Sequence, residues 1–531
     1  MGRRIGPHVV TAMNLGLRNR AGGALALVVC AVVFLSGGAR AGDLPAEDVA
    51  LLERLTWGIS SATVAQFKRL GRDRWLDEQL AADGETILPE RAQEQIDALA
   101  ALKAPLLKTV SAKDQEIRAA NKLEDPDQRA AARRAYQQSL SDIARQAAAR
   151  EILRALYSPR QIHERLTWFW FNHFNVHQAK SNIRLLVGDY VERVIRPNAL
   201  GNFCQLLSMT VRHPAMLRYL DNASNAVGRL NENYAREIIE LHTMGVGSGY
   251  TQRDVEELAR ILTGVGINGT TRTPRLRPAH QTLYHRDGLF EFNPARHDAG
   301  DKTFLGHEIK GNGLEEVDKA VDILCKHPVT AVFISKKLAT YFVGDDPPAP
   351  LVSRMAETFK SSVGDISMVL RVMVQSPEFR EASRTGGKFK DAIHYVLSAI
   401  RLAYDDKVIR NTQPIQSFIN RLGQGLFNRS SPDGYSPLST AWNSPGQMMA
   451  RFEVARQIGS SAGNLFKPEQ ADAATEPAFP LLQNELYFRF LRRDLSPTTL
   501  AALAEAISPQ DWNVLFLSSP EFMRGFAGRA P

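Results

Sequence analysis

The 531-residue sequence has only three cysteines, too few for a disulfide scaffold in a chain of this length. It contains no Gly-x-Ser-x-Gly elbow, no P-loop, no Cys-x-x-Cys and no Cys-x-x-Cys-His motif. The sequence therefore lacks the motifs that usually indicate a serine hydrolase, a P-loop nucleotide hydrolase, a thioredoxin-like protein or a c-type haem protein. What is present is an ordinary globular composition, 44% hydrophobic and 23% charged, which indicates a large folded protein.

Long hydrophobic runs are also scarce, and the longest lies near the N-terminus. Four arginines precede the run "AGGALALVVCAVVFLSGG", and an Ala-Arg-Ala sequence follows it. This order is typical of a secretory signal peptide, which we predict over residues 1–41 with cleavage before Gly42. An uncleaved membrane anchor is the alternative, which the glycines in the run and the Ala-x-Ala site disfavour.

The remainder of the chain is compatible with export. No second segment reaches the roughly 20 apolar residues that cross a bilayer, so we expect no integral membrane span after cleavage. The signal carries five arginines and no acidic residue, so its removal lowers the formal charge from +8 to +3. Such a mild excess gives no argument for nucleic acid binding. We expect a protein of the periplasm or cell envelope.

Cleavage also removes Cys30, which leaves Cys204 and Cys325. An exported protein can keep a disulfide between two such residues. Each of them, however, lies on the apolar face of a predicted helix, where a free cysteine packs as a small hydrophobic residue. This position slightly favours two buried free thiols.

Helical periodicity dominates the mature chain and predicts one large, mainly α domain over residues 42–531. Residues 91–157 are alanine-rich and charged, with a break at "EDPDQ", and predict an inserted α-helical hairpin with a solvated face. The block 150–178 is apolar on nearly every side, as expected of a buried central helix. Residues 280–310 alternate apolar and polar side chains around a turn at 298–301 and predict a small β-hairpin.

The stretch "GRLNENYAREIIELHTMGVGSGYTQRDVEELARILTG" predicts two helices joined by a glycine-rich turn. Thr251 and Asp254 have the spacing of a capping box for the second helix. On the first helix, a wheel of 100° per residue places Glu237 and Glu240 on one side with Arg236. Capping does not explain these carboxylates. We therefore take Glu237 and Glu240 as candidate acid/base groups, and Arg236 as a candidate to orient an anionic substrate group.

Two histidines in "HFNVH", His173 and His177, have the i, i+4 spacing that brings side chains together on one helix face. Such a pair can hold a divalent metal, and Glu237 or Glu240 from another helix would complete a His/carboxylate site. Without the glutamate of a zincin motif between them, a histidine pair is more often packed or hydrogen-bonded. We take both histidines as candidate metal ligands.

The turn "RHDAGDK" adds a further candidate. Asp and Gly favour tight loops, so turn chemistry alone accounts for much of this cluster. His297 is the residue that turn chemistry explains least, and we include it among the candidate catalytic residues.

Several segments together resemble, in order and type, the bacterial family called domain of unknown function 1800. They are "LLERLTWGIS", "WLDEQL", "ERLTWFWFNHFNV", "NENYAREIIELHTMGVGSGYTQRDVEELARILTG", "HDAGDKTFLG" and "SPDGYSP…WNSPGQMMARFEVA". The match runs over nearly the whole mature chain, and the Asn-Glu-Asn-Tyr-Ala-Arg block is its most specific part. The chain departs from the family's pattern in the long helical hairpin and in "FNRSSPDGY".

The resemblance implies an exported, mainly helical protein with no established reaction. It also implies a possible partner, because the family is often encoded beside a second exported family related to sulfatases and phosphatases. The family's pattern includes Asn172 and His173, the helix 231–242, Tyr250, Asp254 and the turn 297–302.

Two functional classes remain open from the sequence. The first is a non-catalytic partner or assembly factor for another exported envelope protein, in which the polar residues form a buried network that fixes helix register. The alternative is a metal-assisted periplasmic hydrolase that uses the His/Glu cluster and a divalent metal.

Overall fold

The computed structural model describes residues 43–527, apart from 85, 271, 386–387, 406, 461–462 and 469–478. The predicted signal peptide, residues 1–41, lies outside the described residues. From Leu44 onward the chain clusters into one compact unit.

Most of the described residues lie in helices, which confirms the predicted mainly α class. The α-helices of the first part are α1 (Ala46–Leu55), α2 (Ser61–Leu70), α3 (Arg72–Leu80), α4 (Glu90–Asp97), α5 (Leu106–Asn121), α6 (Pro126–Tyr157), α7 (Gln161–His173), α8 (Val187–Tyr190), α9 (Phe203–Arg212), α10 (Pro214–Tyr219), α11 (Asn233–Glu237) and α12 (Gln252–Ile261). Within the part of the chain that is described, no helix combines the length and the apolarity needed to cross a bilayer.

The later α-helices are α13 (Pro278–Gln281), α14 (Leu314–Lys326), α15 (Pro328–Phe342), α16 (Ala349–Ser361), α17 (Ile366–Gln375), α18 (Pro377–Thr385), α19 (Ala392–Ala403), α20 (Gln413–Arg421), α21 (Pro445–Ser460), α22 (Pro497–Ala504), α23 (Pro509–Leu517) and α24 (Pro520–Arg524). Short 3-10 or π helices occur at η1 (Ala100–Leu102), η2 (Ile183–Leu185), η3 (Val191–Ile195), η4 (Arg196–Asn198), η5 (Asn222–Ser224), η6 (Ile238–Thr243), η7 (Pro294–Arg296), η8 (Ser439–Ala441), η9 (Gly463–Leu465), η10 (Tyr487–Leu491) and η11 (Arg492–Asp494).

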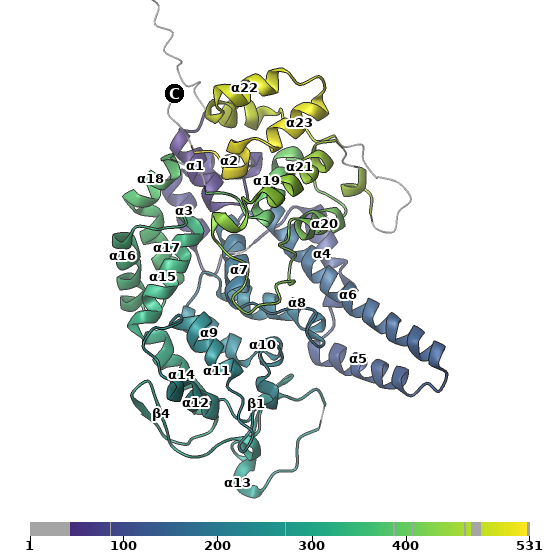
Figure 1. Ribbon diagram of the computed structural model, residues 1–531, viewed down its shortest axis with the longest axis vertical. Coiled ribbons are helices and arrows are strands. Elements are labelled where there is room, and N and C mark those ends of the chain that lie inside the picture. The colour runs from purple at the N-terminus through teal and green to yellow at the C-terminus, as the bar shows by residue number, and fades with distance from the viewer. Residues whose placement is uncertain are drawn as a thin grey trace, which may run out of the picture. The chain divides into compact units, whose positions relative to one another are not determined.

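Helix α7 is buried along most of its length, as its aromatic composition predicted. Figure 1 shows it between α15 on one side and α6 on the other. Trp170 is fully buried and its indole nitrogen donates to Ala199 O at 3.0 Å, so this buried indole has no unmet donor. Because α6 and α15 come from the first and second halves of the chain, both halves meet around α7.

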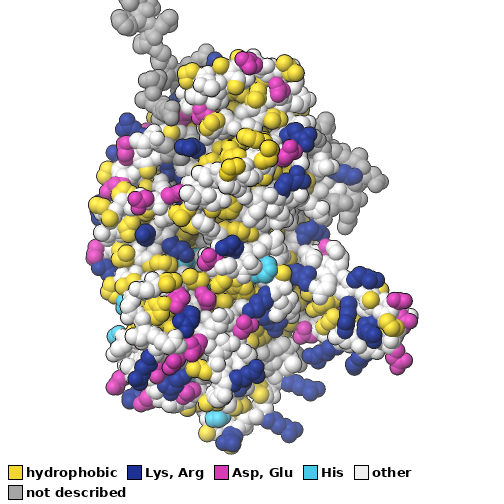
Figure 2. Space-filling view, viewed as in Figure 1, with side chains coloured by type: hydrophobic (Ala, Val, Ile, Leu, Met, Phe, Trp, Pro, Cys, Tyr) yellow, Lys and Arg dark blue, Asp and Glu magenta, His cyan; other side chains and the backbone are white. Residues whose placement is uncertain are grey.

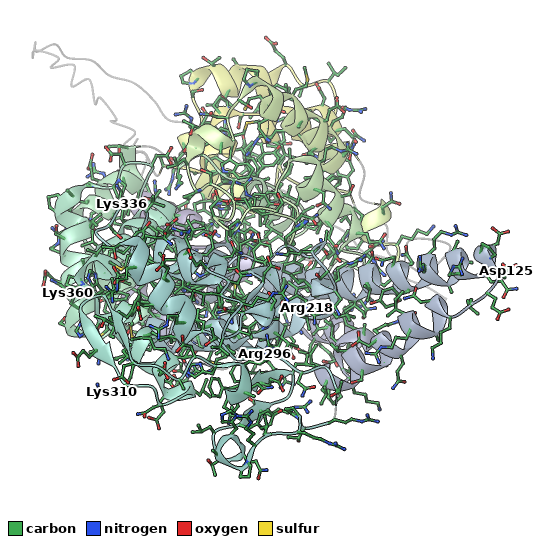
Figure 3. All side chains as sticks on the ribbon, turned by 60° about the horizontal axis from the view of Figure 1, so that its bottom comes forward. Asp125, Arg218, Arg296, Lys310, Lys336 and Lys360 are labelled. Atoms are coloured by element: carbon green, nitrogen blue, oxygen red, sulfur yellow. A yellow bond between two sulfur atoms is a disulfide. The ribbon has the colours of Figure 1, made fainter. Side chains whose placement is uncertain are left out.

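Helices α5 and α6 lie side by side and extend away from α7 (Figure 1). Pro126 is the first residue of α6, and Asp125 caps the helix by accepting from Gln128 N at 2.7 Å. Figure 3 labels Asp125 at the far end of the pair. Charges of both signs cover this end in Figure 2, whereas the second half of α6 is largely buried. That the pair is an insertion into the family domain stays a prediction.

The single β-hairpin predicted over residues 280–310 is wrong in detail, because two small sheets form there. One has the order β1 (Val265–Ile267), β3 (Phe290–Phe292), β2 (His285–Asp287), and the other pairs β4 (Lys302–Phe304) with β5 (His307–Ile309), all antiparallel. The tight turns fall at Gly288 and Gly306, whose φ values of 57° and 80° suit glycine. Residues 298–301 connect the two sheets instead of closing a hairpin.

Cys204 and Cys325 form a disulfide, so the preference for free thiols is wrong. Cys204 lies on α9 and Cys325 near the end of α14, and these helices pack together. The apolar faces that suggested two buried thiols are the faces in contact, which brings the two Cα atoms to 5.4 Å.

Candidate functional site

The asparagines before and within α11 hold neighbouring segments together. Asn225 Nδ2 donates to Ala259 O at 2.8 Å, and its Oδ1 accepts from Asn231 N at 3.0 Å. Asn233 Nδ2 donates to Leu220 O at 3.1 Å. These bonds satisfy backbone groups of the connecting segments, so the asparagines have a structural role.

The predicted polar helix changes type along its length. It is α-helical in α11 and then π-helical in η6, from Ile238 to Thr243. A π-helical turn is wider than an α-helical one, so a wheel of 100° per residue does not hold beyond Glu237. His242 is fully buried, whereas Glu240 is partly exposed.

Arg236 lies at the centre of an ion-pair network on the partly exposed face of this helix. Its guanidinium is 3.2 Å from Glu232 and 3.4 Å from Glu240. It also donates to Gln252 Oε1 at 2.8 Å, and Tyr250 Oη donates to Glu240 at 2.6 Å. The hydrogen bond to this carboxylate raises the pKa of Tyr250. Arg236 is thus paired with carboxylates of its own helix.

Glu237 differs from its neighbours, because its carboxylate makes no hydrogen bond or ion pair with the described residues. Its burial raises its pKa, and the carboxylates of Glu240 and Asp433 act in the same direction against Arg236. Burial and the charge of Glu237 also raise the pKa of Tyr219 to about 12. A carboxyl group whose pKa is raised toward neutrality has a property that general acid/base chemistry uses.

The i, i+4 geometry predicted for His173 and His177 is wrong, because α7 ends at His173 and His177 lies in the following loop. His173 Nε2 is 3.0 Å from His242 O, and its ring packs edge-on against Phe174. Burial holds the pKa of His173 well below its usual range, and the charges of Lys337 and His242 act in the same direction. His173 is a neutral histidine of the core.

The structure does not bring these histidines together with Glu237 or Glu240. Among the residues that are described, no group of three or more His, Cys, Asp and Glu side chains is arranged to hold a metal ion. Metal ligands must converge on one point. His173 instead lies beside His242, with ring centroids 6.0 Å apart.

The end of α7 holds a surface loop, residues 425–435, which we call the clamped loop. Asn172 Nδ2 donates to Tyr435 O at 2.8 Å, and its Oδ1 accepts from Tyr435 N at 2.7 Å. Asn175 Nδ2 donates to two further carbonyls of the loop, at 3.0 and 2.8 Å. A Cβ at Gly434 would lie 2.1 Å from Asn172 O, so this close approach requires glycine.

His297 belongs to a closed network that joins the turn 297–302 to α14. Its Nε2 lies 2.9 Å from Glu316 Oε1 and its Nδ1 lies 2.8 Å from Thr263 O. Lys302 Nζ lies 2.5 Å from Glu316 Oε2. Burial acts to raise the pKa of Glu316, but the hydrogen bonds from His297 and Lys302 outweigh it and lower the pKa. We call these three ionisable side chains the His297 network.

The comparison with family models identifies the chain. A model described as "Protein of unknown function (DUF1800)" matches residues 50–524. The chain belongs to the DUF1800 family. No curated protein and no solved structure matches the chain. The matched range contains the clamped loop and the His297 network, so both are features of the DUF1800 part of the chain.

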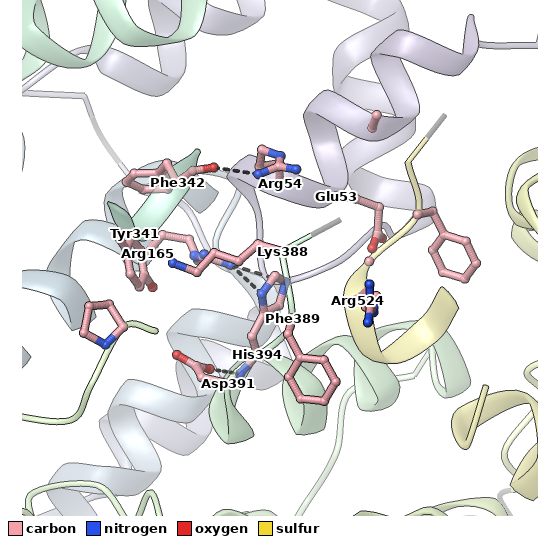
Figure 4. A pocket seen from close by; sticks show the side chains of 14 residues that line it. Glu53, Arg54, Arg165, Tyr341, Phe342, Lys388, Phe389, Asp391, His394 and Arg524 are labelled. Carbon is pink, nitrogen blue, oxygen red and sulfur yellow. Dashed lines mark hydrogen bonds between the residues drawn. The ribbon is translucent and has the colours of Figure 1, made fainter. Parts of the chain in front are cut away.

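A further group of charged residues in this DUF1800 protein lines the pocket shown in Figure 4, which has an empty volume of about 560 Å³ including its mouth. We call it the cationic pocket. Its charged and aromatic lining residues are Glu53, Arg54, Arg165, Tyr341, Phe342, Lys388, Phe389, Asp391, His394, Arg524 and Phe526. None of them was among the candidates predicted from the sequence.

Arg165 is the most enclosed cation of the pocket. It donates to Thr56 O at 3.0 Å and lies 3.0 Å from His394 Nδ1. Its guanidinium also stacks on the rings of Trp57 and Tyr341, with centroid distances of 4.7 and 4.9 Å. In Figure 4, Arg165 and His394 meet in the middle of the pocket.

The other interior cations also contact backbone oxygens. Arg54 donates to Phe342 O at 3.0 Å and to Val343 O at 2.7 Å. Lys388 Nζ donates to Thr340 O, and its nearest carboxylate is Asp345 at 3.7 Å.

Burial shifts several pKa values in the pocket, and neighbouring positive charges act in the same direction. Burial, with Arg165 acting in the same direction, lowers the pKa of Arg54 to about 10. Burial lowers the pKa of Lys388 to about 8, with carboxylates opposing and the two arginines adding to the shift. Burial and the surrounding cations hold the pKa of His394 well below its usual range.

One sequence signal could have found this pocket. Arg165 stands inside the most apolar block of the chain, and an arginine is almost never fully buried unless it is paired. Arg54 and Lys388 carry no such signal, because only the fold brings α1 and the segment before α19 to α7.

Proposed function

We propose that this DUF1800 protein is an exported, non-catalytic partner or assembly factor for a second exported protein of the cell envelope. The clamped loop is the observation that carries the proposal. Side chains of the α7 end hold its backbone, while its Arg429 and Asp433 form an exposed ion pair at 3.2 Å. A charged loop on a rigid scaffold is a common form of recognition surface.

The backbone of Phe427 in the clamped loop supports a functional role. Its φ of 64° lies in the left-handed region, which residues other than glycine rarely adopt. The side chain is buried, and Phe427 O accepts from Gln178 N at 2.9 Å. Such strain persists only where surrounding contacts fix it, and it concentrates at functional loops.

The state of three of the candidate site residues favours a role without catalysis. Arg236 pairs with carboxylates of its own helix, His173 is hydrogen-bonded in the core, and His297 is enclosed in the His297 network. Networks of this kind fix the relative positions of helices.

The Cys204–Cys325 disulfide supports export. Disulfides form and persist in oxidising compartments such as the periplasm, and are rare in the cytosol. This agrees with the signal peptide predicted over residues 1–41.

The partner proposal is tested by co-expression with the sulfatase- or phosphatase-like exported protein that the family resemblance implies. We expect the two to co-purify from the periplasm, and Asp433→Lys to weaken the complex at least tenfold. Glu453→Lys is the matched control, because Glu453 also forms an exposed pair, with Arg456 at 3.0 Å. Absence of a complex, or equal weakening by both variants, would refute the proposal.

The metal-assisted hydrolase remains the second candidate, and Glu237 is the observation that favours it. This carboxyl group is partly buried, without a partner among the described residues, and has a raised pKa. Elemental analysis of protein purified without chelator tests the metal, with Glu237→Gln alongside. About one equivalent of a transition metal, lost in the variant, would support the hydrolase over the partner role.

A further inference from the structure

The cationic pocket carries more positive than negative charge. Four of its lining residues are arginine or lysine and two are acidic. Both acidic residues are engaged within the chain: Glu53 accepts from Ile59 N at 2.8 Å and faces Lys390 at 3.6 Å, and Asp391 caps α19 through His394 N at 2.8 Å. The cations therefore exceed the carboxylates available to them, even when Asp345 is counted, which lies 3.7 Å from Lys388 outside the lining.

Three buried polar atoms of the pocket have no hydrogen-bond partner among the described residues. One is Glu53 Oε2, which faces Lys390 at 3.6 Å, and the two donors are Arg165 Nε and the Tyr341 hydroxyl. Both side chains are at least nine-tenths buried, with Arg165 only 4% exposed. Buried donors are almost always met by an acceptor, so these two indicate an acceptor that the chain does not supply.

Further positive charge lies behind the pocket wall. Arg451 is fully buried and donates to Lys390 O at 2.6 Å. Its guanidinium lies 4.6 Å from the Phe389 ring centroid and 4.8 Å from that of Tyr395. Within the described chain Arg451 forms no ion pair with a carboxylate. Its charge therefore strengthens the positive field inside the pocket.

The arrangement of these cations indicates the class of ligand. They come from α1, α7, the segment before α19 and the C-terminal end of α24, so they approach the pocket from several directions (Figure 4). A tetrahedral oxyanion presents acceptors in several directions and is bound well by arginine and lysine. The excess of two positive charges among the lining residues matches a dianion.

We propose that the cationic pocket binds a tetrahedral oxyanion of the phosphate or sulfate class, either free or as the anionic end of a larger ligand. Arg165 and Lys388 hold the oxyanion inside the pocket, and Arg524 contacts it at the exposed mouth. The Tyr341 hydroxyl donates to it from the aromatic wall. This binding does not depend on the partner role proposed above.

Calorimetric titration of the mature protein with inorganic phosphate at constant ionic strength tests the proposal. We expect saturable binding with a dissociation constant below about 1 mM. Sulfate competes with phosphate, whereas acetate does not, because a singly charged planar carboxylate leaves donors unmet. No saturable binding of phosphate up to about 10 mM, or equal binding of acetate, would overturn the proposal.

Variants locate the binding to the pocket. Lys388→Gln is expected to weaken phosphate binding at least tenfold, while Lys326→Gln removes a lysine of an exposed ion pair and leaves binding unchanged. Arg524→Gln lies at the exposed mouth and does not threaten folding, so a severalfold loss there keeps the test valid if Lys388→Gln does not fold. Unchanged binding in either folded pocket variant contradicts the proposal.

Phenyl phosphate separates the two sources of the oxyanion. Binding at least tenfold tighter than that of inorganic phosphate would show that the aromatic wall accepts an attached group, and would support the anionic end of a larger ligand. Equal binding would support free phosphate.

Discussion

The His297 network and the cationic pocket are both built from buried ionisable side chains, but their charges are balanced differently. In the network, Glu316 accepts from both His297 and Lys302, so the chain supplies every partner. In the pocket, Arg165 contacts a carbonyl oxygen and aromatic rings, and Lys388 donates to Thr340 O with its nearest carboxylate, Asp345, at 3.7 Å. The pKa directions follow this difference: Glu316 shifts toward its charged form and Lys388 toward its neutral form.

A dense group of titratable residues is therefore not itself evidence of a functional site. Where the charges satisfy one another, the group stabilises the fold. Where charges of one sign accumulate, a ligand of the opposite sign gains affinity. The sequence-based candidates were polar residues that capping and turn chemistry left unexplained, so they include His297 and omit Arg165, which lies in an apolar block.

The largest effect on the free energy of unfolding is expected from disrupting the His297 network. Glu316→Gln leaves Lys302 and His297 buried without their carboxylate, so we expect the free energy of unfolding to fall by about 3 to 5 kcal/mol. Urea unfolding followed by circular dichroism measures the change. Glu315→Gln, at the exposed neighbouring position, should cost less than about 0.5 kcal/mol. Equal losses of unfolding free energy in Glu316→Gln and Glu315→Gln would show that the network does not stabilise the fold.

A smaller effect is expected from releasing the helix that carries Glu316. The disulfide ties α14 to α9, and replacing both cysteines by alanine should lower the free energy of unfolding by about 2 to 4 kcal/mol. Reductant should destabilise the wild-type protein and leave the double variant unaffected. A wild-type protein insensitive to reductant during unfolding contradicts this expectation.

Lys388 is expected to give a pH response opposite to that of a lysine that is paired with a carboxylate and has a raised pKa. The folded-state pKa of Lys388 is about 8 against an ordinary value of 10.5, so between these values the unfolded chain binds the proton that the folded chain lacks. The free energy of unfolding should therefore rise with pH across this window, by about 1 to 3 kcal/mol more in the wild type than in Lys388→Gln.

Urea unfolding at several pH values measures this difference. The pKa of Lys337 is also lowered to about 8, but it contributes equally to both proteins and cancels in the comparison. The groups that face Lys388 electrostatically are Asp345, Asp391, Arg54 and Arg165. Identical pH profiles would mean that Lys388 is not held in a repulsive site.

The smallest effect is expected at Glu237, which belongs to neither group. Its folded-state pKa is raised, so its contribution to stability is present at low pH and is lost as the pH rises through that pKa. Glu237→Gln has no carboxyl group to ionise at this position. Its free energy of unfolding at pH 7 should therefore exceed that of the wild type by less than about 1 kcal/mol. The difference should shrink in acid. Glu256→Gln is an exposed control on α12, and a less stable Glu237→Gln at pH 7 would contradict the assignment.

Local signals in the sequence predicted local structure well. The Thr251–Asp254 capping box forms, and Val255, Leu258 and Ala259 are buried as the periodicity indicated. The burial of α7 followed from its aromatic residues. These features depend on side chains a few residues apart, so contacts with distant segments do not alter them.

Features that depend on contacts between distant segments could not be predicted in this way. His173 lost its expected geometry because α7 ends there, where Asn172 is hydrogen-bonded to the clamped loop more than 250 residues away in the chain. The π-helical η6 alters the faces of the polar helix without a sequence signal. The cationic pocket joins four segments that no periodicity connects.

The Cys204–Cys325 bond also determines how the protein responds to proteolysis. The bond closes a covalent ring across a sequence separation of 121, and this ring contains the polar helix and both sheets. A protease that cuts the chain once within the ring releases no fragment, because the two pieces stay joined through sulfur. The nicked protein migrates as one chain on a non-reducing gel and as two on a reducing gel.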